Sequence, residues 1–156
     1  MEHLFMQGMT FIVKTITRLL IGVIFLFGIY ITFYGHLTPG GGFAGGIILA
    51  CGFILLTLAF GKNLALSKLS DMWASLLDNL GALTFWTIAL LGYVGGYFFM
   101  NFIERSDPFG LFSSGTILVN NIAIGVKVMA SIFAVFMALT IFGRFVSDLV
   151  NGEDDE

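Results

Sequence analysis

The sequence predicts an all-α integral membrane protein with four transmembrane helices and a short interfacial helix between the second and third. Of the 156 residues, 58% are hydrophobic and 11% are charged, which is more apolar sequence than a soluble core of this size could bury. Four apolar segments are also long enough to cross a bilayer, which takes about 20 residues of helix. These segments cover residues 13–34, 42–60, 81–103 and 116–142. We therefore expect one transmembrane domain, residues 1–145, and an acidic solvent-exposed tail, residues 146–156.

Composition argues against several classes of function. The net charge is −3 and the seven Lys and Arg are scattered along the chain, so no nucleic-acid partner is expected. The single cysteine, Cys51, excludes an internal disulfide. No His, Cys or carboxylate cluster has metal-ligand spacing, and no nucleophile and base form a plausible pair. We expect no metal, no cofactor and no catalytic residue.

The first span ends at a glycine-rich corner. Pro39 has a fixed φ and no N–H to donate, and Gly40, Gly41 and Gly42 permit positive φ, so the first helix must end here. His36 stands beside the corner, and histidine is a residue type that can exchange a proton under physiological conditions. Its ring could relay a proton, or it could pin the turn with a hydrogen bond.

The second span carries small residues at helical spacing. Gly42, Gly46 and Ala50 recur every four positions, with Gly41 and Gly45 one step round the helix. Such a strip lets a second helix approach backbone to backbone. We expect this span to pack closely against a neighbour through these residues.

Residues 62–80 read as a short helix lying along the membrane surface. Apolar side chains follow the three-and-four spacing of one helical face, namely Leu69, Met72, Trp73, Leu76, Leu77 and Leu80. Polar side chains take much of the other face, namely Ser70, Asp71, Ser75, Asp78 and Asn79. This division is typical of an interfacial helix or a simple connector.

The fourth span contains a lysine. Lys127 lies about 15 Å along the helix from its start, near the middle of the hydrocarbon. Asn120 and Ser131 share its face, and Asn121 is adjacent to Asn120. A polar stripe therefore runs through an otherwise apolar helix.

Lys127 needs a counter-group, because an ammonium in hydrocarbon costs at least about 2.5 kcal/mol. The nearest carboxylates expected within the chain are Glu104, Asp107 and Asp148, all at helix ends. Glu104, which forms an interfacial cluster with Arg105 and Asp107, is a candidate for an ion path. A carboxylate of another polypeptide is the alternative. Lys127 could pass a proton, or it could be structural, with its head bound to carbonyls or an Asn.

Basic residues indicate the orientation of the chain. One side of the membrane holds five, namely Lys14, Arg18, Lys62, Lys68 and Arg144, and the other holds only Arg105. Because basic residues on short loops favour the cytoplasm, we expect both termini to be cytoplasmic.

The corner resembles a known family. The run Gly-His-x-x-Pro-Gly-Gly-Gly-Phe-x-Gly-Gly, which contains His36, Pro39 and Phe43 and closes with Gly45 and Gly46, resembles the MnhB family. That family comprises the MnhB subunits of Mrp-type sodium/proton antiporters and their counterparts in membrane-bound hydrogenases. The resemblance covers residues 10–145 in layout and length and gives these corner residues the family's characteristic positions.

The resemblance implies a membrane subunit of a bacterial or archaeal cell-membrane complex that exchanges sodium ions for protons. Its partners would be other membrane subunits, including antiporter-like subunits similar to those of respiratory complex I. One alternative is a sodium-translocating membrane-arm subunit of a hydrogenase-type or related respiratory complex. Another is a purely structural assembly subunit, and a third is a self-contained oligomeric channel. The chain would have no catalytic centre of its own.

Overall fold

The computed structural model describes residues 9–103 and 110–153 and is helical, without strands in those residues. The membrane-length helices are α2 (Phe11–Phe33), α3 (Gly41–Phe60), α5 (Asp71–Leu91) and α6 (Thr116–Glu153). Two shorter elements are α4 (Lys62–Lys68) and the 3-10 helix η1 (Gly92–Gly95). The four apolar spans are Phe11–Phe33, Gly41–Phe60, Asp71–Gly95 and Thr116–Gly143. The predicted fold class is confirmed, and the chain is a multi-pass membrane protein.

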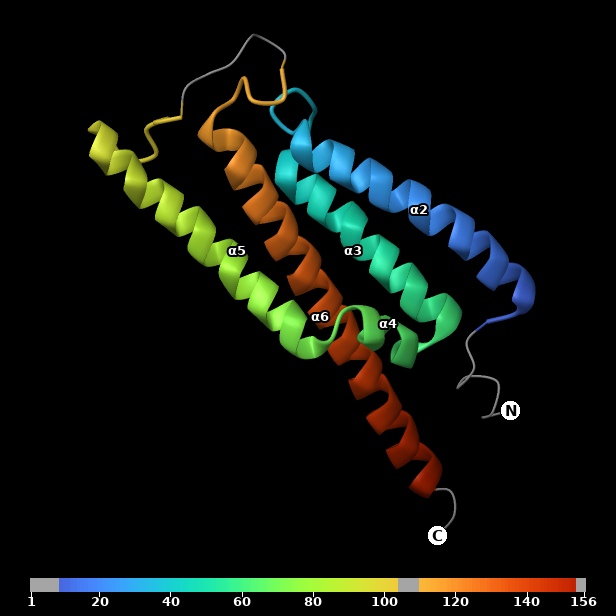
Figure 1. The fold of residues 1–156 in the computed structure, drawn as a ribbon. Coiled ribbons are helices and arrows are strands. Elements are labelled where there is room, and N and C mark those ends of the chain that lie inside the picture. The colour runs from blue at the N-terminus through green and yellow to red at the C-terminus, as the bar shows by residue number, and fades with distance from the viewer. Residues whose placement is uncertain (1–8, 104–109, 154–156) are drawn as a thin grey trace.

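The long helices lie in one row, in the order α2, α3, α6, α5 (Figure 1). α6 therefore has a helix on each side, whereas α2 and α5 form the two edges. The start of α2 and the end of α6 lie at the same end of the row, and α6 extends beyond its neighbours there (Figure 1). Phe133 and Met137 of α6 are the largest fully buried side chains among the described residues, and they form a small core with Ala65, Leu69 and Ala74.

The third membrane helix begins ten residues before the predicted start of its span. Leu69 is extended, and the Ser70 hydroxyl caps a new helix by accepting from the Trp73 N–H at 3.4 Å. From there α5 runs without a break to Leu91. The 3-10 helix η1 follows it and ends before Gly96, whose φ is 117°. The predicted surface helix over residues 62–80 is therefore only α4, and the predicted span 81–103 is shifted towards the N-terminus.

The last helix extends beyond the fourth apolar span. α6 continues to Glu153, so it includes most of the predicted tail, residues 146–156. The candidate Glu104 and its neighbours up to residue 109 lie outside the described residues, as do residues 1–8 and 154–156.

Candidate functional site within the bilayer

Glycines set the distance between α3 and α6. A Cβ on Gly46 would lie 2.6 Å from the Gly125 carbonyl oxygen and 2.8 Å from Cβ of Val128. Gly42 meets the backbone of Asn121 in the same seam, and Ala50 is fully buried. The small residues of α3 therefore make the expected close approach, and the helix that they contact, α6, belongs to the same chain. The other edge of this row of small residues contacts α2, because a Cβ on Gly45 would lie 2.9 Å from the Gly28 carbonyl oxygen.

The glycine-rich corner adopts the positive φ angles that its glycines permit. Gly40 has φ 102° and Gly41 has φ 52°, so both positions favour glycine. Pro39 and Phe43 are exposed at this corner. Asn121 lies under it, where its Oδ1 accepts from the Gly42 N–H at 3.4 Å. The Asn121 amide nitrogen is buried without a hydrogen-bond partner among the described residues.

His36 joins the corner to the loop before α6. Its Nε2 lies 3.2 Å from the Gly110 carbonyl oxygen and 3.2 Å from Oγ of Ser113. Because a carbonyl can only accept, Nε2 must carry the proton in the first contact. His36 Nδ1 is buried and has no partner in the described part of the chain. The ring thus holds two loops together at the end of the molecule opposite α4 (Figure 1).

The main polar cluster lies between α5 and α6, which run antiparallel (Figure 1). Lys127 Nζ lies 2.5 Å from Oδ1 of Asp78, and the Ser131 hydroxyl donates to the same oxygen at 2.7 Å. Gly81 makes this pairing possible, since a Cβ there would lie 2.7 Å from the Ala123 carbonyl oxygen. The two helix backbones therefore approach closely one turn from the ion pair.

Asp78 is the counter-group that the sequence reasoning missed. It lies about 10 Å along α5 from the first residue of that helix, within the apolar span Asp71–Gly95. The residue pattern predicts Asp78 on the polar face of a surface helix. A signal was present, because Asp71, Ser75 and Asp78 form a stripe at i, i+4 and i+7, which one transmembrane helix could turn towards Lys127.

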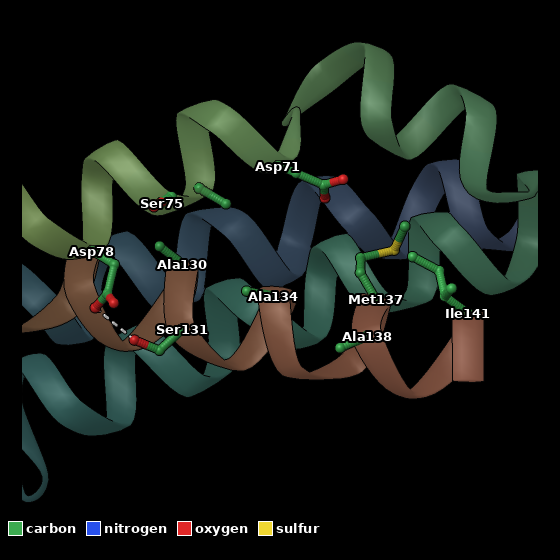
Figure 2. A pocket seen from close by; sticks show the side chains of 10 residues that line it. Asp71, Ser75, Asp78, Ala130, Ser131, Ala134, Met137, Ala138 and Ile141 are labelled. Atoms are coloured by element: carbon green, nitrogen blue, oxygen red, sulfur yellow. Dashed lines mark hydrogen bonds between the residues drawn. The ribbon is translucent and has the colours of Figure 1, made fainter. Parts of the chain in front are cut away.

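A groove leads to the ion pair along the α5–α6 seam (Figure 2). Its volume is about 370 Å³. Asp71, Ser75 and Asp78 line it from α5, and Ser131, Ala134 and Ile141 are among the residues that line it from α6. Figure 2 shows Asp78 and Ser131 towards one end of this group and Ile141 at the other. The Lys127 and Asp78 side chains keep 42% and 36% of their surface exposed.

The candidate polar residues therefore fall into two groups. Lys127 and Ser131 lie together on the α5 side of α6, and Asn120, seven residues before Lys127, shares that face. Asn120 is 9% exposed, and its Oδ1 has no hydrogen-bond partner in the described ranges. Asn121 and His36 lie instead at the corner and its loop.

A row of apolar helices with an ion pair between two of them defines a multi-pass membrane protein with charged side chains inside its membrane-spanning part. The family profile described as "Domain related to MnhB subunit of Na+/H+ antiporter" matches residues 12–134. The chain therefore belongs to the MnhB family, and the resemblance drawn from the corner is confirmed.

One named relative gives the same assignment, and a second relative is uncharacterized. A protein of Staphylococcus haemolyticus named putative antiporter subunit mnhB2 is 30% identical over 135 residues, which cover 83% of this chain and 93% of that protein. An uncharacterized protein of Methanocaldococcus jannaschii is 38% identical over 117 residues, 67% of this chain and 42% of that protein. This chain thus spans less than half of the methanogen protein.

One solved structure shares the fold. A chain of the membrane-bound sulfane sulfur reductase, an archaeal respiratory membrane complex, superposes with a TM-score of 0.69 at 31% sequence identity. The alignment covers 81% of this chain and 56% of the reductase chain. This chain thus spans a little over half the length of the reductase chain that it matches.

Proposed function

We propose that the chain is a membrane subunit of a cation/proton antiporter complex and that the Lys127–Asp78 pair lies on its ion or proton path. The observation that carries this proposal is the exposure of that pair. Charged side chains inside a membrane normally face protein or water, because contact with hydrocarbon is costly. A half-exposed ion pair at one end of a groove therefore needs water or another subunit beside it.

The family supports the antiporter assignment, with sodium as the expected cation and larger antiporter-like subunits as partners. In this role the chain supplies a polar route and has no catalytic centre of its own. A second candidate is a membrane-arm subunit of a respiratory complex, which the similarity to the sulfane sulfur reductase favours. Affinity purification of a tagged copy from native membranes separates the two, because only the second would bring redox subunits with it.

The test of the path is Lys127→Met in the assembled complex. The variant keeps the length of the aliphatic stem but removes the charge, so the complex should assemble while cation-driven proton exchange falls. Exchange is measured in everted membrane vesicles with a pH-gradient dye after sodium addition. The matched control is Lys68→Met, because Lys68 is exposed at the end of α4 and lies outside the groove. Normal exchange by an assembled Lys127→Met complex would leave the chain a structural role only.

A further inference from the structure

We propose that Asp78 and Ser131 form a binding site for an alkali-metal cation, and that the Lys127 ammonium occupies the cation's position when no metal ion is bound. This inference rests on the proposed function and deepens it, because it assigns the exchanged cation a place in this subunit.

The geometry around a single oxygen atom suggests the site. The Lys127 ammonium and the Ser131 hydroxyl both donate to Oδ1 of Asp78, at 2.5 and 2.7 Å. The ammonium is thus a monovalent cation held against a carboxylate by a flexible stem. If it withdraws, the Asp78 carboxylate and the lone pairs of the Ser131 hydroxyl remain. Both are hard oxygen ligands of the kind that alkali and alkaline-earth cations prefer.

The groove provides room for the rest of a coordination shell. Its volume of about 370 Å³ can hold several water molecules, since each occupies about 30 Å³ in the liquid. Ser75, one turn before Asp78 on α5, adds a further hydroxyl to the lining. A cation that approaches along this groove can therefore keep part of its hydration while it exchanges other waters for protein oxygens.

Charge balance links cation binding to proton release. A net charge inside the bilayer is costly, so the site favours the same total charge before and after exchange. Lys127-NH3⁺ paired with Asp78-COO⁻, plus one metal cation, becomes Lys127-NH2 beside a cation-bound Asp78-COO⁻, plus one proton released to water in the groove. No covalent bond to carbon changes, and the charge balances at one cation for one proton.

In the described part of the chain, few other ionisable side chains lie near the Lys127–Asp78 pair. Asp71 is the other ionisable side chain among the groove-lining residues, about 10 Å along α5 from Asp78. α3 has no Asp, Glu, Lys, Arg or His, and Lys68 of α4 is exposed. Cation binding should therefore strengthen as pH rises, because only the release of the Lys127 proton makes room for the metal ion at constant charge.

The test uses the whole complex carrying Lys127→Met, with sodium chloride against choline chloride as the probe. Without the Lys127 ammonium beside it, the Asp78 carboxylate takes up a proton and then reacts with dicyclohexylcarbodiimide. Mass spectrometry locates and quantifies the labelled residue. Sodium should displace that proton and protect Asp78, whereas choline at equal ionic strength should not. Asp71, which also lines the groove and lies about 10 Å along α5 from Asp78, should show no difference between the two salts and serves as the internal control.

A second substitution identifies the hydroxyl ligand. Ser131→Ala in the same background should raise the sodium concentration for half-protection about tenfold, the order expected when a charged group loses one polar contact. If Lys127→Met does not assemble, Lys127→Gln replaces it. Equal labelling of Asp78 in sodium and choline would overturn the cation site.

The path and the cation site fail in distinguishable ways. Impaired exchange without sodium protection would leave Lys127 on a proton path and reject the cation site. Sodium protection with normal exchange would support the site and reject its place on the path.

Discussion

Replacing Gly81 by alanine should loosen the α5–α6 seam that holds the ion pair. An alanine Cβ would lie 2.7 Å from the Ala123 carbonyl oxygen and 2.9 Å from Lys127 Cβ, against the 3.4 Å at which ordinary contacts begin. The new Cβ would thus be 0.7 Å too close to a backbone oxygen, and backbone atoms cannot rotate away as the end of a side chain can. The two helices must therefore separate by roughly that amount one turn from Asp78.

The expected magnitude follows from two opposing terms. Overpacking a tight contact costs about 1–3 kcal/mol, whereas alanine is favoured over glycine within a helix by about 1 kcal/mol. Gly22→Ala is the matched control, because a Cβ on Gly22 would meet nothing within 4 Å. Both variants share the helix-propensity gain, so the difference between them isolates the steric cost at about 1–3 kcal/mol.

The assay is the temperature at which half of the tagged chain is lost from the purified complex. Gly81→Ala should lower that temperature relative to Gly22→Ala, and it should also reduce sodium-driven proton exchange. Equal retention temperatures for the two variants would refute the close approach of α5 and α6.

Three further predictions concern the α3–α6 contact, the ion pair itself and the orientation of the chain. Gly46→Leu should block assembly, because even its Cβ would lie 2.6 Å from the Gly125 carbonyl oxygen; recovery of the intact complex in an affinity purification would contradict this. Exchanging the charges with Asp78→Lys and Lys127→Asp together should restore more assembled complex than either single change, since each single change leaves two like charges facing each other; quantitative blotting of the complex decides. Reporter fusions at either end of the chain should report the cytoplasm, and an external signal at both ends would reverse the orientation.

The sequence was most informative where backbone chemistry is local. Pro39 and the glycines after it predict a break between two spans, because they restrict or permit particular φ values wherever they occur. The small residues of α3 likewise predict a close helix contact. The sequence could not say that α6 of the same chain makes that contact, because which elements pair depends on how the helices are arranged in space.

The polar partner of Lys127 was missed for a different reason. In residues 71–79, a polar face that contacts water and one that contacts another helix have the same periodicity. The pattern predicts that Asp78 contacts water, because it lies on the polar face of a segment whose other face is apolar. The need of a lysine within the bilayer for a carboxylate is the stronger constraint, since water does not reach a membrane interior without a polar route.

The single row of helices has a consequence for mutational scanning. Because α2 and α5 are edges and each long helix presents open faces, the chain's own packing restricts substitutions along the three seams between long helices and around α4. A scan of every position within the assembled complex would therefore separate two kinds of intolerance. Sensitive positions on the seams report this fold, whereas sensitive positions on the open faces would outline the footprints of neighbouring subunits.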